Sequence, residues 1–62
     1  MRITIDYVAA RNDPGNRKEA EAIIRKDNPE LAAEISHYTL ASWIDDMIQD
    51  WVDELRRERG II

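Results

Sequence analysis

The chain has 62 residues, so it can build one small domain, residues 1–62, and is too short for two hydrophobic cores or for most enzyme scaffolds. It contains no cysteine, which excludes disulfides, thiolate metal sites and cysteine nucleophiles. No apolar run approaches the roughly 20 residues of a membrane span, and residues 1–6 do not resemble a secretion signal. We therefore expect a cytoplasmic protein without membrane attachment.

The net charge of −4 conceals a strong asymmetry along the chain. Residues 27–55 contain eight acidic residues and no lysine or arginine, whereas the segments on either side are net basic. An acidic surface repels phosphate, which disfavours binding to nucleic acid or to an anionic membrane and favours a basic protein surface. The alternative is a solvated helix face without a partner.

The N-terminal segment shows an alternating pattern. Ile3, Ile5 and Tyr7 alternate with Thr4 and Asp6, and a period of two predicts a half-buried β-strand. The alternative is a short helix that Thr4 caps and that runs to residue 11.

The segment 13–16, Asp-Pro-Gly-Asn, predicts a turn, because proline and glycine suit the two central positions of a type II turn. Asn16 precedes Glu19 by three residues, which is the spacing of a capping box. We expect a first helix over about 17–27 that turns Ala20, Ile23 and Ile24 toward the core.

Pro29 suits the first position of a further helix, in which Leu31, Ile35 and Tyr38 recur at helical spacing. This stripe and the one that follows it point to nearly opposite sides of a single helix. Either the chain breaks near residues 37–39, with Thr39 as a new N-cap, or one long helix has different neighbours along its length.

The last helix has the longest apolar stripe. It comprises Leu40, Ile44, Met47, Ile48, Trp51 and Leu55, with Trp43 and Val52 at its edges. Gly60 is placed to end the helix, after three arginines that favour its C-terminal end. The predicted fold class is mostly α with one N-terminal β-strand (α+β): a strand, then two or three helices, the last long and amphipathic.

A lone strand leaves backbone groups unpaired, and so small a core gives a monomer little stability. Both observations favour a homodimer, with the tryptophan side of the last helix at the interface; the expected interface or anchor residues are Trp43, Met47, Trp51 and Leu55. A compact monomer is the alternative, and the same tryptophans could then anchor a partner protein.

No residue pattern predicts catalysis, a cofactor or a metal. Glu34 and His37 have the Glu-x-x-His spacing of di-iron bundles, but such sites need several further carboxylates from facing helices. Glycine-rich phosphate loops and catalytic triads are missing from the sequence. We therefore predict a non-enzymatic protein.

The preferred function is that of a small acidic regulator or inhibitor that binds a basic surface of a partner protein, with nucleic-acid mimicry as one form. The expected partner-binding residues are Asp45, Asp46, Asp50, Asp53 and Glu54. The alternative is a small dimeric DNA-binding regulator that inserts the N-terminal strand into the major groove. In that interpretation Arg2 and Thr4 suit DNA, whereas Asp6 opposes it.

Overall fold

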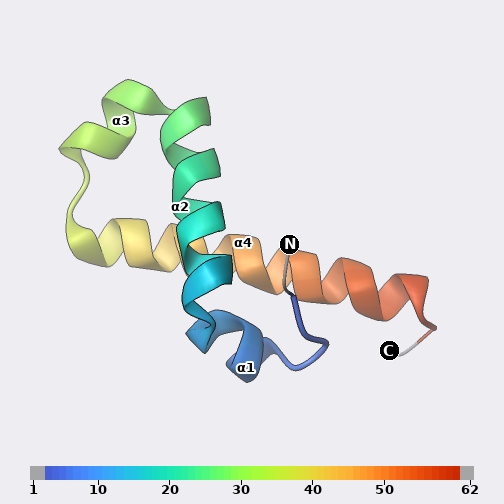
Figure 1. The fold of residues 1–62 in the computed structure, drawn as a ribbon. Helices are drawn as coiled ribbons and strands as arrows, with labels where there is room; N and C mark the ends of the chain where they lie inside the picture. Colours follow the sequence, from blue (N-terminus) through green and yellow to red (C-terminus); the bar gives the residue numbers. More distant parts are fainter. Residues whose placement is uncertain (1–2, 61–62) are drawn as a thin grey trace.

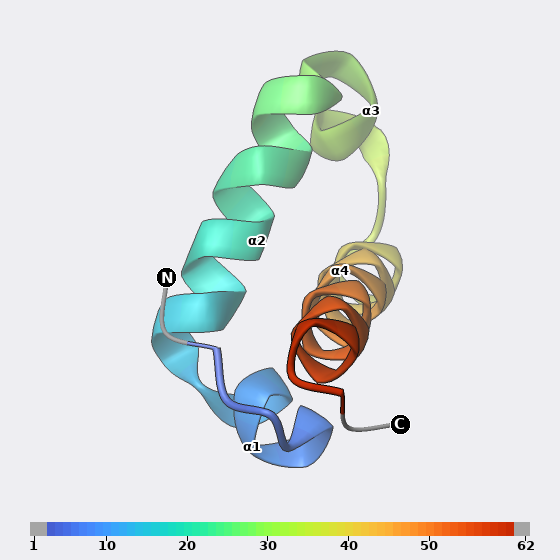
Figure 2. The same cartoon turned by 90° about the vertical axis from the view of Figure 1, so that its right-hand side faces the viewer.

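The computed structural model describes residues 3–60, which form four α-helices (Figure 1). The helices are α1 (Tyr7–Asn12), α2 (Pro14–Asp27), α3 (Pro29–Glu34) and α4 (His37–Glu58). α2 crosses α4, α1 packs against both, and α3 lies at the end of α2 that is remote from α1 (Figures 1 and 2). No helix within residues 3–60 combines the length and the apolar composition that crossing a membrane requires.

The predicted N-terminal strand is wrong, because the described residues contain no strand and 83% of them are helical, which makes the fold all-α. Asp6 is the N-cap of α1, and its carboxylate accepts a hydrogen bond of 2.9 Å from the backbone N–H of Val8. The alternating burial is nevertheless present: Ile3, Ile5 and Tyr7 are partly buried. A period of two therefore reports which side chains face the core but not whether the backbone is paired.

The helix at residue 14 begins earlier than predicted, because Asp13 rather than Asn16 is its N-cap. The Asp13 carboxylate accepts hydrogen bonds from the backbone N–H groups of Gly15 (2.8 Å) and Asn16 (3.3 Å). Pro14 occupies the first helical position, where a proline loses no intrahelical bond. Asp13, which is extended as residues before proline tend to be, thus joins α1 directly to α2.

Asn16 is the one buried polar residue of the described chain, with no exposed surface. Its Nδ2 donates to the carbonyl oxygen of Ala10 near the end of α1 (3.3 Å), which also accepts from the backbone N–H of Asp13 (3.3 Å). Its Oδ1 has no hydrogen-bond partner within residues 3–60. Asn16 therefore connects α1 to α2 through its side chain instead of capping α2.

The chain does break between two helices, but earlier than residues 37–39. Pro29 begins α3 as predicted, α3 ends at Glu34, and Ser36 instead of Thr39 is the N-cap of α4. The Ser36 hydroxyl accepts from the backbone N–H of Thr39 (3.2 Å). Since the break separates Leu31 from Tyr38, their predicted stripe is lost: these side chains are 47% and 90% exposed, and Ala32 is the buried residue of α3.

The core of the protein depends on one row of α4 that we call the core row: Leu40, Ile44, Ile48 and Val52, all buried. Four-residue spacing places them along one side of the helix, where they form a cluster with Ala10 of α1 and with Ala20 and Ile24 of α2. Val52, expected at the edge of the stripe, is fully buried. The predicted stripe is thus rotated, and its tryptophans lie at the margin of the core.

The end of α4 agrees with the sequence. Arg56 and Arg57 lie in its last turn, and Gly60 follows with a φ of 71°, the left-handed conformation that glycine adopts at helix C-termini.

Replacement of Asp13 tests the connection between α1 and α2. We expect Asp13→Ala to lower the free energy of unfolding by about 1 kcal/mol, because two backbone N–H groups lose their acceptor. For a domain of this size the midpoint of thermal unfolding then falls by roughly 4–8 °C. Asp13→Ser should retain most of the stability, since serine also caps helices.

The matched control is Asp27→Ala, which removes an exposed acid from the opposite end of α2. It should change the free energy of unfolding by less than about 0.5 kcal/mol. Equal losses for the two alanine variants would contradict the capping role of Asp13.

Candidate functional site

Beside the core row, α4 carries a second line of large side chains that we call the apolar row: Trp43, Met47, Trp51 and Leu55. All four are partly buried, and Trp43, Met47 and Trp51 pack against the core cluster. Steps of four residues keep them on one side of the helix. The predicted anchor residues therefore do form one surface feature, half inside the protein and half accessible.

The next line on α4 is acidic. Asp46, Asp50, Glu54 and Glu58 follow one another at four-residue spacing and are all exposed; we call them the acidic row. Within residues 3–60, the two ion pairs shorter than 4 Å join Arg17 to Asp45 and Arg25 to Glu21. No member of the acidic row takes part in either pair, so its carboxylates face solvent beside the apolar row.

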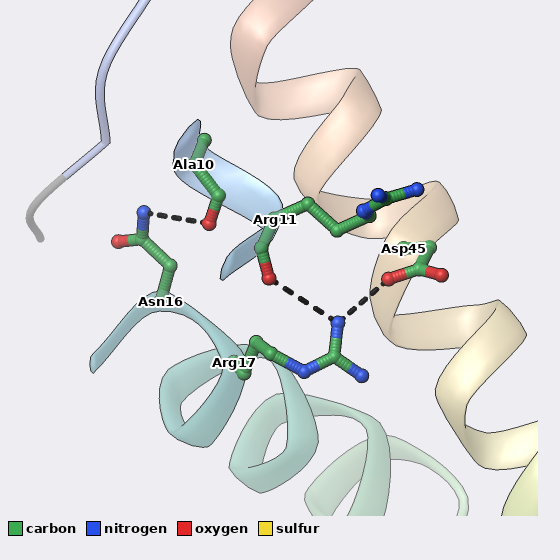
Figure 3. A network of polar contacts seen from close by, with 5 residues as sticks. All are labelled: Ala10, Arg11, Asn16, Arg17 and Asp45. Carbon is green, nitrogen blue, oxygen red and sulfur yellow. Dashed lines mark hydrogen bonds and ion pairs between the residues drawn. The ribbon is translucent and has the colours of Figure 1, made fainter. Parts of the chain in front are cut away.

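Asp45, predicted as a partner-binding residue, lies on the other flank of α4 and has a structural contact. Its Oδ1 accepts from Nη1 of Arg17 at 2.7 Å, and the same nitrogen donates to the carbonyl oxygen of Arg11 at 3.3 Å (Figure 3). Arg17 thus joins α1, α2 and α4. Asp45 contributes to the fold rather than to the exposed acidic surface.

The other four predicted acids also differ in exposure. Asp53 is partly buried, and its carboxylate accepts from Nε2 of Gln49 at 2.7 Å. Asp46, Asp50 and Glu54 are exposed. Of the five acids expected to bind a partner, the structure therefore brings three into one continuous line and directs Asp45 toward α2.

A groove of about 280 Å³, which we call the α2–α4 groove, lies where the last turn of α2 passes α4. Its lining residues are Ile24, Asn28, Trp43, Asp46, Met47 and Asp50. Ile24, Trp43 and Met47 supply its apolar lining, and the exposed carboxylates of Asp46 and Asp50 belong to the acidic row. The side-chain amide of Asn28 donates to the carbonyl oxygen of Ile24 at 3.4 Å, at the end of α2.

A second groove, of about 410 Å³, lies near the end of α4 and is called the terminal groove. It is lined by Ile3, Trp51, Glu54, Leu55, Glu58 and Arg59. It also combines a tryptophan with two carboxylates, but it contains an arginine of its own. The two tryptophans of the chain thus lie in two grooves of different charge.

The opposite flank of α4 has a smaller hollow of about 210 Å³ at its N-terminal end. Arg17, Lys18 and His37 line it together with Glu21, Leu40, Ala41 and Ile44. Two of its charged groups already have partners, since Arg17 pairs with Asp45 and Glu21 with Arg25. One paired group is a cation and the other an anion, so the pairings leave the net charge of the hollow unchanged and Lys18 as its remaining charge.

Glu34 and His37, which form the Glu-x-x-His pattern, do not lie on one helix face in the structure. Glu34 ends α3 and His37 begins α4, with the break between them. The described residues also contain no group of three or more histidine, aspartate or glutamate side chains arranged to hold a metal ion.

Sequence reasoning missed two parts of this site. Ile24 and Asn28 form the α2 wall of the groove, and Arg17 removes Asp45 from the acidic surface. Helical spacing along α4 contains no signal for either, because both depend on where α2 crosses α4. Comparisons with protein-family models, with curated proteins and with solved structures found no match to this chain.

The contact between Arg17 and Asp45 can be measured with a double-mutant cycle of Arg17→Gln and Asp45→Asn in urea unfolding. Because both side chains are about one-third exposed (34% and 33%), we expect a coupling free energy of only about 0.2–1 kcal/mol, reduced by salt. The same cycle with Asp46→Asn should give no coupling. Equal coupling of Arg17 to both aspartates would contradict the assignment of Asp45 to a structural ion pair and of Asp46 to the exposed acidic row.

Proposed function

We propose that the chain is a non-enzymatic protein–protein interaction module: a small acidic regulator or inhibitor that acts in the cytoplasm by binding a basic surface of a partner protein. The observation that supports this best is the acidic row, four exposed carboxylates that lie beside a half-accessible apolar row and outside both ion pairs of residues 3–60. An apolar strip next to charges of one sign resembles the centre and rim of a protein interface.

The acidic row destabilises α4, because its carboxylates repel one another. Asp46, Asp50 and Glu54 stand at successive i,i+4 positions, where like charges destabilise a helix by roughly 0.2–0.5 kcal/mol per pair. A basic partner would convert this repulsion into attraction. Complementary charge chiefly speeds association and rejects wrong partners, while the apolar row would supply buried area.

Nucleic-acid mimicry is one form of this function, and the spacing of charges limits it. Carboxylates four residues apart lie about 6 Å apart along the helix axis. A DNA strand carries one phosphate per about 3.4 Å of the duplex axis. The acidic row therefore has about half the charge per length of axis of one DNA strand, which supports a basic protein surface in general more than a close imitation of DNA.

The alternative functions lose part of their basis. A DNA-binding regulator of the ribbon type needs a strand, and residues 3–6, which would supply it, form none; Arg2 lies outside the described residues. A homodimer through the apolar row stays a prediction, but an unpaired strand no longer supports it because the described residues contain no strand. A symmetric copy packed on that row would also bring a second acidic row close to the first, which is unfavourable.

Charge reversal tests the proposed function. The triple variant Asp46→Lys, Asp50→Lys and Glu54→Lys should lose capture of partner proteins from the native host by at least about tenfold, because the attraction becomes repulsion. The matched control reverses three exposed acids away from the acidic row, Asp27→Lys, Glu30→Lys and Glu34→Lys, and should retain capture.

The proteins that only the wild type and the control variant retain should be basic, and their binding should weaken as salt rises. Circular dichroism shows whether each variant is folded. Equal capture by both triple variants, or retention of acidic proteins alone, would contradict the proposal.

A further inference from the structure

The α2–α4 groove is lined by three apolar side chains, by two carboxylates and by the amide of Asn28. Trp43 and Met47 of α4 are partly accessible in it, and Ile24 closes it from α2. Asp46 and Asp50 follow Trp43 by three and seven residues, so all three lie on the same side of α4. An occupant of this groove meets an indole and a thioether along its length and two carboxylates at the rim.

The volume sets an upper limit on the occupant. About 280 Å³ lies just below the 300–1,000 Å³ that small-molecule and cofactor sites usually occupy. A groove of this size suits a side chain that a partner protein inserts. Side chains that a partner inserts are where interfaces concentrate their binding energy, and this groove is open enough to admit one from the surface.

We propose that the α2–α4 groove binds an arginine side chain of the partner, with the aliphatic stem along Trp43 and Met47 and the guanidinium at Asp46 and Asp50. This inference rests on the proposed function and names the group through which the basic partner is recognised.

Three properties of arginine match the groove. Its long stem packs on apolar surface while its charged end reaches polar groups. Its planar guanidinium is attracted to the face of an aromatic ring and pairs with carboxylates through two hydrogen bonds. Lysine shares the stem and the charge, but its compact and strongly hydrated ammonium has no planar group to stack or to form paired bonds.

The rest of the molecule supports this assignment. The terminal groove also joins a tryptophan to two acids, but Arg59 already lines it and supplies a positive charge there. In the α2–α4 groove, no lysine or arginine is among the lining residues. The carboxylates of Asp46 and Asp50 are therefore left for a cation from outside the described chain.

The test is a titration of the ¹⁵N-labelled full chain with N-acetyl-arginine amide, followed by NMR. The two tryptophans give two indole N–H signals, so Trp51 is an internal control for Trp43. We expect a saturable shift of the Trp43 indole and of the backbone signals of Asp46 and Asp50, while the Trp51 indole stays in place. N-acetyl-lysine amide should give a weaker response.

Two controls separate charge from shape. N-acetyl-citrulline amide has nearly the same form without the charge and should shift Trp43 several-fold less. The variant Asp46→Asn with Asp50→Asn should weaken the arginine response several-fold, whereas Glu30→Gln with Glu34→Gln, two exposed acids of α3, should leave it unchanged. Equal responses to arginine and citrulline, or an unmoved Trp43, would overturn the proposal.

A hexalysine peptide distinguishes failure of this inference from failure of the proposed function. If hexalysine shifts the signals of the acidic row while arginine amide leaves Trp43 unmoved, the groove is not the anchor site and the proposed function stands. If neither probe shifts these signals, both fail. A doubled mass in light scattering, with Trp43 shifting on dilution, would assign the groove to a second copy of the chain and overturn the arginine site.

Discussion

The arrangement of the molecule depends on the packing of one side of α4 against α1 and α2. The core row places Leu40, Ile44, Ile48 and Val52 in this contact, which fixes the rotation of α4 about its own axis. Since each residue advances by about 100°, fixing one row fixes all the others. The apolar row must then lie at the margin of the core and the acidic row beyond it, in solvent.

This core is small, so it provides little free energy of folding to offset unfavourable interactions on the surface. Three of its eight buried apolar residues are alanines, and the largest fully buried apolar side chains are Ile48 and Val52. A core of this size supports roughly 3–5 kcal/mol of stability. Repulsion within the acidic row is therefore a notable fraction of the total.

Local signals in the sequence were sufficient for several features. Pro29 marks the start of α3, Gly60 ends α4, and the apolar periodicity from Leu40 onward predicts a long amphipathic helix. Each of these is decided by a residue's own backbone preference or by helical spacing. Helical spacing also places the four residues of the apolar row together and three of the five predicted acids on one exposed line of α4.

Features that depend on a neighbouring helix were not predictable. The alternation at Ile3, Ile5 and Tyr7 predicts a strand because packing against the core buries these side chains in turn, although the local cap at Asp6 starts a helix there. Asparagine is a common N-cap residue, but Asn16 is buried and donates to the carbonyl oxygen of Ala10 in α1. Arg17 and Asp45 are 28 residues apart, and no local pattern connects them. The rotation of α4 depended on this same tertiary information.

Cysteine accessibility tests the placement of the core row and of the acidic row most directly, since the chain has no cysteine of its own. Single variants Asp50→Cys, Val52→Cys and Glu54→Cys place a thiol on the acidic row, on the core row and again on the acidic row. The account predicts that maleimide labels the thiols at 50 and 54 at nearly the rate in urea. The thiol at 52 should react at least about tenfold more slowly, because labelling there requires the helix packing to open. Equal rates at the three positions, or protection at 50 and 54 but not at 52, would contradict it.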